Sequence, residues 1–280
     1  MFSRTRIRTA MLSLGAAAVV AGVAMAVPAS ASSAPEAKPV AKGPKPTVVL
    51  VHGAFADATG FSTVITKLTR DGYPVRTVSN PLRGLATDTA AAKDVLNDVK
   101  GPIVLVGHSY GGAVISNAAA GNPHVKALVY LAALAPDKGE AIFGPEDVPM
   151  PHPIPPLPLR EEPTVAADGT AGTDLYLQED KFRETFAADV DPATAAAMAV
   201  AQRPGNEILL TSKSAAAAWR TIPSWYLLTK EDHANSPDLQ HFFAQRARAH
   251  TTEINSSHAV YVSHPDAVTR IIEQADRGTR

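Results

Sequence analysis

The chain has 280 residues, of which 45% are hydrophobic and 19% charged, and it contains no cysteine. The missing cysteine excludes disulfides, thiol catalysis and cysteine-ligated metal sites. The net charge of −1 gives no support to a nucleic-acid partner or a polybasic membrane contact, because either needs a concentrated positive surface.

The first 31 residues have the pattern of a secretory signal peptide. Arg4, Arg6 and Arg8 precede an uncharged apolar run over 11–27, and an A-x-A cleavage site ends at Ala31. A retained membrane anchor is the alternative, because a run of this length nearly spans a bilayer. The cleavage site favours a secreted protein, cleaved near Ala31, with no stable membrane anchor afterwards.

A linker is predicted to follow the cleavage site. Residues 32–46 are rich in Pro, Lys and Ala and contain almost nothing to bury, which is typical of an extended, disordered segment. The ordered domain is therefore expected to begin at Thr47 and to occupy 47–280.

Short apolar runs alternate with amphipathic stretches along this domain. The runs predict six strands, at 47–52, 73–78, 102–107, 125–133, 224–229 and 250–255. Helical spacing or helix-start signals predict helices at 61–70, 90–99, 109–120, 237–249 and 265–276. Continuous apolar strands separated by helices indicate a parallel sheet that is covered on both faces.

The segment between the fourth and fifth strands, about 139–218, has a different character. Its first part, 141–160, is rich in proline, which forbids long helices. Residues 175–202 are predicted to be helical. Because the segment shows no sheet pattern and is too long for a surface loop, we interpret it as an inserted cap over the domain.

Gly107-His108-Ser109-Tyr110-Gly111 is the strongest chemical signal in the chain. The alternative interpretation of Ser109 is an ordinary N-cap serine at a junction between a strand and a helix. Here an apolar strand leads into the G-x-S-x-G sequence and a helix of small residues leaves it, which is the context of a nucleophile elbow. The two glycines permit the tight turn, so Ser109 is the predicted nucleophile.

A serine hydroxyl needs a base that is itself held by a third group. After an elbow of this kind the acid and then the histidine follow along the chain. His258 comes just after the last strand and is the expected base. His264 is the alternative, but it precedes Pro265 and is better explained by the start of the final helix.

The acid is expected after the penultimate strand, 224–229. Asp232 lies past the end of this strand and is the favoured candidate. Glu231 is adjacent and could replace Asp232 as the acid, because a shift of one residue in the loop exchanges the directions in which the two side chains point. Asp137, after the fourth strand, is a third and weaker candidate.

Two backbone N–H groups are expected to form an oxyanion hole. The amide of Tyr110 lies at the start of the helix after Ser109, where the helix dipole is positive. The second donor should come from the loop after the first strand, where Gly53 permits a sharp turn. Ala54 is the expected donor there and Phe55 the fallback.

Several further side chains are candidates for the wall of a substrate pocket. His52 and His108 end strands, and the others are aromatic residues, for which core packing is the alternative. The candidates are His52, Phe55, His108, Tyr176, Phe182, Phe186 and Trp219.

Four segments carry a resemblance to a known family. VLVHGAF, LVGHSYGG, ALVYLAALAPDKGE and SSHAVYVSHPDAV resemble the α/β-hydrolase superfamily, and within it the small esterase branch of plant methyl esterases and hydroxynitrile lyases. The likeness covers roughly 47–140 and 224–275. It implies an α/β-hydrolase fold of about six mostly parallel strands with helices on both faces and an inserted cap.

The resemblance also implies an activity, namely a serine hydrolase that cleaves carboxylic esters or lactones of small-to-medium, largely apolar compounds through a Ser-His-Asp triad and an acyl-enzyme. Dehalogenases and epoxide hydrolases of the superfamily use an aspartate nucleophile, whereas this chain has Ser109. Hydroxynitrile lyases carry a lysine after the catalytic histidine, where this chain has Ala259. The alternatives are a receptor-like ligand-binding protein with little turnover and a cofactor-free haloperoxidase-like activity.

No metal or organic cofactor is expected. The sequence contains no H-E-x-x-H, no His/Asp cluster at ligand spacing and no phosphate-binding glycine loop. The expected partner is a small-molecule ester substrate, and the sequence leaves the oligomeric state open.

Overall fold

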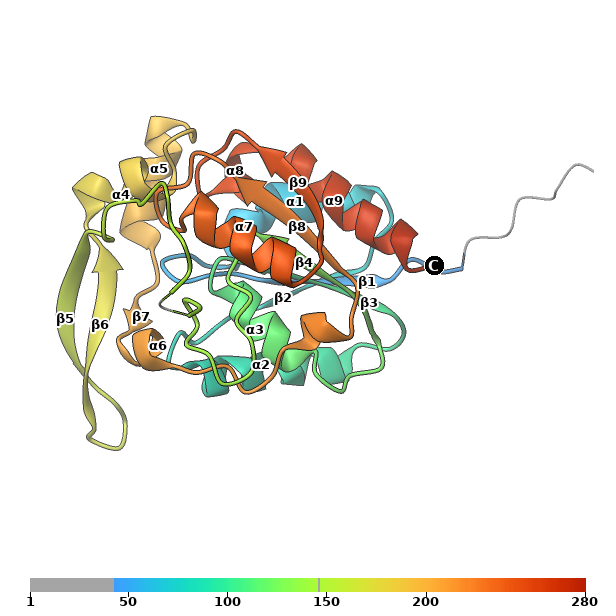
Figure 1. Cartoon of the computed structure of the whole chain (residues 1–280), viewed down its shortest axis with the longest axis horizontal. Helices are drawn as coiled ribbons and strands as arrows, with labels where there is room; N and C mark the ends of the chain where they lie inside the picture. Colours follow the sequence, from blue (N-terminus) through green and yellow to red (C-terminus); the bar gives the residue numbers. More distant parts are fainter. Residues whose placement is uncertain (1–42, 146) are drawn as a thin grey trace, which may run out of the picture. The chain divides into compact units, whose positions relative to one another are not determined.

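A computed structural model describes residues 43–145 and 147–280 (Figure 1). The predicted signal peptide at 1–31 and most of the predicted linker at 32–46 lie outside the described residues, so both stay predictions. The first strand begins at Thr47.

Six parallel strands form the central sheet, in the order β2-β1-β3-β4-β8-β9. Their bounds are β1 (Thr47–Val51), β2 (Val75–Val78), β3 (Ile103–His108), β4 (Val125–Leu131), β8 (Ser224–Thr229) and β9 (His250–Ile254). The predicted parallel sheet is confirmed, and the ends of its strands differ from the predicted ones by at most two residues.

Helices cover both faces of this sheet. Figure 1 shows the pair α1 and α9 on one face, and α2 and α3 pack on the other together with α7. The bounds are α1 (Ser62–Arg70), α2 (Leu85–Asp98), α3 (Gly111–Ala118), α7 (Pro237–Arg246) and α9 (Pro265–Gly278). Shorter helical turns are η1 (Ala58–Phe61), η2 (Ala218–Arg220) and α8 (Val260–Ser263).

The inner strands β1, β3, β4 and β8 are largely apolar because both of their faces are buried, whereas the edge strands β2 and β9 contain polar residues at exposed or half-buried positions. In β1, Val49 and Val51 join the core beneath α2 and α3, whereas Val48 and Leu50 join the core beneath α1 and α9. Successive side chains of a strand point to opposite faces, so a strand buried twice reads as one continuous apolar run. This is the physical reason that these strands could be predicted from sequence.

The order of the strands determines where a site can form. From β1 the chain crosses to β2 on one side, and it then returns to β3 on the other side of β1. At such a switch point the loops leaving two neighbouring strands diverge and open a crevice at their carboxyl ends. The loop after β1 contains Gly53, and the turn after β3 contains Ser109.

The segment 139–218, called the cap below, lies between β4 and β8. It contains an antiparallel sheet in the order β5-β6-β7, so the expectation that it lacks sheet is wrong. Its elements are β5 (Leu159–Val165), β6 (Ala171–Leu177), α4 (Glu179–Phe186), α5 (Pro192–Ala201), β7 (Gly205–Asn206) and α6 (Ile208–Thr211).

The predicted helix over 175–202 is also wrong at its start. Leu175 and Leu177 are buried while Tyr176 between them is half-buried, and this period of two belongs to strand β6. The rest divides into α4 and α5, because Asp191 accepts hydrogen bonds from the first backbone N–H groups of α5 and Pro192 starts that helix.

Candidate active site

Ser109 occupies a strained turn between β3 and α3. Its backbone φ is +53°, in the left-handed region that residues with a side chain rarely adopt. A Cβ on Gly107 would lie 2.5 Å from the carbonyl oxygen of Gly111, so only glycine fits before the turn. A Cβ on Gly53 would lie 2.6 Å from the Cβ of Ser109. The loop after β1 and the serine turn are therefore in direct contact.

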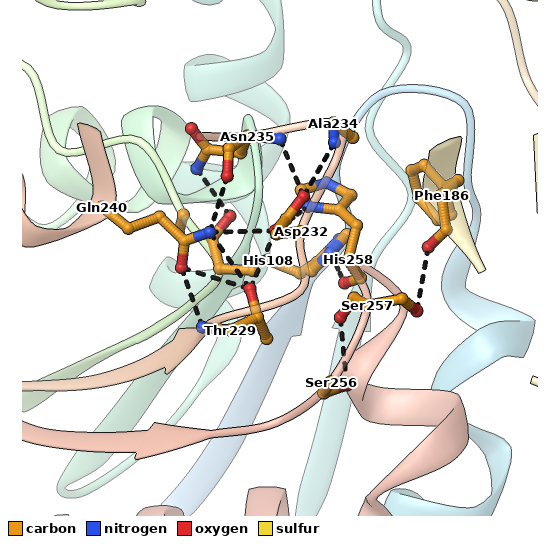
Figure 2. Close-up of polar contacts among 12 residues, drawn as sticks. His108, Phe186, Thr229, Asp232, Ala234, Asn235, Gln240, Ser256, Ser257 and His258 are labelled. Carbon is orange, nitrogen blue, oxygen red and sulfur yellow. Dashed lines mark hydrogen bonds and ion pairs between the residues drawn. The ribbon is translucent and has the colours of Figure 1, made fainter. Parts of the chain in front are cut away.

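His258 and Asp232 form a buried pair at the ends of the neighbouring strands β9 and β8. The Nδ1 of His258 lies 2.7 Å from Oδ2 of Asp232, and the two residues are 2% and 1% exposed (Figure 2). Because the carboxylate accepts a hydrogen bond from Nδ1–H, the tautomer assigned to neutral His258 leaves Nε2 free to accept a proton.

Asp232 is held by four further hydrogen bonds, shown in Figure 2. Its Oδ1 accepts from two backbone N–H groups and its Oδ2 from two side chains. The donors are Ala234 N (2.8 Å), Asn235 N (2.8 Å), Thr229 Oγ1 (2.8 Å) and Gln240 Nε2 (2.9 Å). This set of donors stabilises the buried carboxylate and fixes its orientation toward His258.

The two other candidate acids lie elsewhere. Glu231 is exposed, and its backbone N–H donates to the carbonyl oxygen of Ser256. Asp137 pairs with Arg220, whose Nε lies 2.8 Å from Oδ1. Of the three acids, Asp232 is the one in contact with His258. His264 precedes α9 at its N-cap, as expected, and pairs with Asp189 rather than with Asp232.

Ala54 and Tyr110 both lie beside Ser109 at the wall of one cavity. Ala54 follows Gly53 in the loop after β1, and Tyr110 is the N-cap residue of α3. Within 43–145 and 147–280, neither backbone N–H of these two residues donates to another protein group. The two N–H groups are thus available for a ligand beside the serine.

The cavity has a volume of about 250 Å³, and Ser109 and His258 both line it. Most of its wall is apolar and comes from the cap and from the loops after the strands. The apolar lining includes Phe55, Leu134, Ile142, Ile154, Leu157, Phe186, Leu209 and Leu239. Asn206, Asn235 and Ser236 add polar groups to the wall.

Of the seven predicted wall residues, Phe55 and Phe186 line this cavity, and the other five do not. Tyr176 lies on the cap sheet beneath the guanidinium of Arg160, 4.5 Å from the ring centroid. Phe182 is buried within the cap, stacked on Phe186. Trp219 packs in the core and donates from Nε1 to the carbonyl oxygen of Pro136. His52 and His108 are buried beneath the site.

Residues 48–271 match the family described as the alpha/beta hydrolase family. The chain belongs to this family. The predicted fold and family are confirmed.

One curated relative and one solved structure match nearly the whole of the described part, and a second curated relative matches a shorter stretch. The alpha/beta hydrolase nvfD of Aspergillus novofumigatus is 27% identical over 82% of this chain and 96% of its own length. The carbendazim hydrolyzing esterase of a Nocardioides species is 32% identical over 34% of this chain and 45% of its own. A crystal structure of polyneuridine aldehyde esterase shares the fold with a TM-score of 0.68, at 18% identity over 82% of this chain and 98% of its own. The family and its esterases support an enzyme that hydrolyses carboxylic esters.

His52 and His108 support the hydrolase site from below. His108 donates from Nε2 to the backbone carbonyl oxygen of His258, at 3.0 Å. His52 donates from Nδ1 to the carbonyl oxygen of Gly53 and accepts at Nε2 from the N–H of Asn80. Burial lowers the pKa of both rings, and for His108 the neighbouring His258 lowers it further. Both rings are therefore neutral in the folded protein at neutral pH.

We expect the free energy of unfolding to fall as the pH drops from about 7 to about 5. The pKa of these histidines is about 6.5 in the unfolded chain and lower in the fold, so the unfolded chain binds more protons in this window. The stability from the neutral rings is fully present above 6.5 and is lost as the pH falls toward the folded pKa. Denaturant unfolding of His108→Gln, which keeps a donor for the His258 carbonyl, should show a shallower pH dependence by up to about 1.4 kcal/mol per pH unit.

His124→Gln is the matched control, because His124 is exposed. It should keep the pH dependence of the wild type, since water solvates its ring in both states. An unchanged slope in His108→Gln would contradict the role given to burial.

Several residues of the site could not be singled out from the sequence. Thr229 and Gln240 hold the carboxylate of Asp232, although one ends a strand and the other lies in α7. Leu209 and Leu239 come from α6 and α7 and meet at the cavity. Position at a strand end was a usable signal for Thr229. The other three could be found only from the packing of distant segments.

Within residues 43–145 and 147–280, no helix is long and apolar enough to cross a membrane. In the same part of the chain, no three His, Asp or Glu side chains are grouped to hold a metal ion.

Proposed function

We propose that this protein is a serine hydrolase that cleaves carboxylic esters or lactones of small-to-medium, largely apolar compounds. One observation carries the proposal: Ser109 and His258 line the same apolar cavity, and Nδ1 of His258 is hydrogen-bonded to the buried carboxylate of Asp232. The family agrees with this chemistry, and so does the carbendazim hydrolyzing esterase, which is 32% identical over 34% of this chain.

The first step forms an acyl-enzyme. The Oγ of Ser109 attacks the ester carbonyl carbon while Nε2 of His258 takes the hydroxyl proton. The proton on Nδ1 stays with the histidine, and the carboxylate of Asp232 stabilises the imidazolium that results. Asp232 is suited to this task because five donors hold its carboxylate at a fixed place.

Charge develops on the carbonyl oxygen in this step. The N–H groups of Ala54 and Tyr110 are the donors for that oxyanion, and each contributes about 3 kcal/mol to lowering the barrier. Tyr110 is kept in place by its hydroxyl, which donates to the buried carboxyl of Asp88 at 2.7 Å. Because α3 starts at Gly111, its positive end adds to the same field.

The second half of the reaction reverses these roles. His258 gives its proton to the leaving alkoxide, so the alcohol departs and Ser109 remains acylated. His258 then takes a proton from a water molecule that attacks the acyl carbon. It returns this proton to Oγ of Ser109 as the bond between Oγ and the acyl carbon breaks, so the acid leaves and the serine hydroxyl is restored. All proton transfers pass through one histidine.

The wall of the cavity defines the class of substrate. Its lining is mostly aliphatic and aromatic, and among residues 43–145 and 147–280 no Lys, Arg, Asp or Glu contributes to it. An anionic or cationic group would lose its hydration there without gaining a partner. Neutral, apolar esters are therefore the substrates we propose.

A series of p-nitrophenyl esters tests this function with the full-length chain. The leaving group is constant and only the acyl chain varies, so changes in kcat/KM report on the cavity. We expect kcat/KM to rise from acetate toward hexanoate by roughly fourfold per methylene, which corresponds to about 0.8 kcal/mol of apolar burial. A hemisuccinate ester of the same length as the pentanoate is the matched control and should be much poorer.

The outcome also separates the enzyme from a receptor-like binder. A protein that bound the unreacted ester tightly, detected as a rise in Tm with ester and no release of nitrophenol, would contradict the proposal. Equal rates for pentanoate and hemisuccinate would contradict the substrate class alone.

A further inference from the structure

The cap contacts the segment that carries His258. Phe186, the last residue of α4, accepts a hydrogen bond at its carbonyl oxygen from the N–H of Ala259, at 2.9 Å. Its ring lies edge-on to the His258 ring, with 4.7 Å between centroids. Figure 2 shows Phe186 beside His258 and Ser257, with its carbonyl group directed to the same segment. The end of α4 is thus in contact with His258 through backbone and side chain.

Asp189, three residues farther along the cap, contacts the same segment with its carboxylate. Oδ1 accepts a hydrogen bond from the hydroxyl of Ser257, and Oδ2 lies 3.2 Å from Nε2 of His264. Ser257 comes directly before His258 and is 1% exposed. His264 follows α8. One carboxylate therefore holds the chain on both sides of His258.

The electrostatics agree with this geometry. Partial burial raises the pKa of Asp189, but hydrogen bonds from Ser257, Ser256 and Ser263 outweigh it and lower the pKa. The charged form of the carboxylate is the one that these groups stabilise. Among the described residues, the side chains that contact this carboxylate include Ser257 and His264, and they lie in 256–264 rather than in the cap.

Asp191, two residues farther, has a different role. Its Oδ1 accepts hydrogen bonds from the N–H groups of Ala193 and Thr194 at the start of α5. This acid serves the cap alone. Asp191 thus stabilises the cap, whereas Asp189 contacts residues outside the cap.

We propose that Asp189 is a positioning residue for ester hydrolysis, through which the cap fixes the segment around His258 and so the aim of its imidazole. The inference rests on the proposed function. Asp232 orients the ring through Nδ1, whereas Asp189 fixes the backbone from which the ring extends. The cap then contributes to proton transfer as well as to the pocket wall.

Steady-state kinetics on the full-length chain with p-nitrophenyl butyrate test this proposal. Asp189→Ala should lower kcat by about 10- to 100-fold with KM within about twofold, because the substrate still binds but the base is misplaced. Asp189→Asn keeps an acceptor for the Ser257 hydroxyl and should recover part of kcat. Asp191→Ala is the matched control, and it should keep the kcat of the wild type with a modest loss in Tm.

Two further measurements distinguish the positioning role of Asp189 from a contribution to stability alone. Ser257→Ala should lower kcat, and its combination with Asp189→Ala should cost no more than the larger single effect, since both remove one contact. The low-field proton resonance of Nδ1–H in His258 should shift or broaden in Asp189→Ala while Tm stays near that of Asp191→Ala.

Three results would overturn the inference: an unchanged kcat in Asp189→Ala, a loss equal to that in Asp191→Ala, or additive losses in the double variant. Failure of the proposed function itself has another signature, namely ester hydrolysis that persists in Ser109→Ala.

Discussion

Ser109→Ala should abolish ester hydrolysis, with a loss in kcat of about 10⁶-fold, the size found when the nucleophile of a serine protease is removed. The variant lacks the hydroxyl that we propose forms the acyl-enzyme, while the cavity and the proposed oxyanion donors remain. Alanine should tolerate the turn no worse than serine, because both have one Cβ at φ +53°. Release of nitrophenol from a p-nitrophenyl ester measures the effect, and circular dichroism verifies the fold.

Ser116→Ala is the control for this variant. Ser116 is a buried serine of α3, the helix that follows Ser109, and its hydroxyl donates to the carbonyl oxygen of Gly112. It should lose some stability and keep its activity. Retention of more than about 1% of the activity in Ser109→Ala would refute the assignment of the nucleophile, since a removed nucleophile leaves far less.

Asp232→Asn should lower kcat by about 10⁴-fold with little change in KM, as the same replacement does in a serine protease triad. An amide that donates to Nδ1 would stabilise the wrong tautomer of His258 and leave Nε2 carrying the proton. The amide would also place a donor among the existing donors to Oδ1 and Oδ2, so the variant should unfold at a lower temperature. Kinetics with one p-nitrophenyl ester and calorimetry measure the two effects.

Glu231→Gln is the matched control, because it makes the same chemical change at the adjacent, exposed acid. It should leave kcat within about twofold and Tm unchanged, as is usual for a surface substitution. A larger loss in Glu231→Gln than in Asp232→Asn would reverse the choice between the two acids.

The sheet and the elbow could be predicted because local sequence determines them. β1 and β3 are apolar at every position facing either core, and their length matches strands rather than helices. The turn at Ser109 needs glycine where a Cβ would strike the backbone, so its pattern is visible in five residues. Asp232 and His258 are predicted from their places after β8 and β9, and the structure brings these two side chains into contact.

The cap could be predicted less well because distant contacts determine its structure. The pairing of β6 with β5 and β7 overrides the charges in 175–202 that suggested a helix. Tyr176 and Trp219 are aromatic like Phe55 and Phe186, but only the direction of each element decides which ring meets the cavity. Residue type alone does not contain this information.

Because of the order of the strands along the chain, Ser109 is synthesised and folds before Asp232 and His258. The elbow at Ser109 follows β3, whereas Asp232 and His258 follow β8 and β9, the last two strands to be synthesised, which add to the sheet beside β4. Contacts between segments so far apart in sequence form late, because a long loop must close first. A growing chain therefore carries the serine turn well before the histidine–aspartate pair exists, and the proposed nucleophile acquires its base only when the final edge of the sheet is in place.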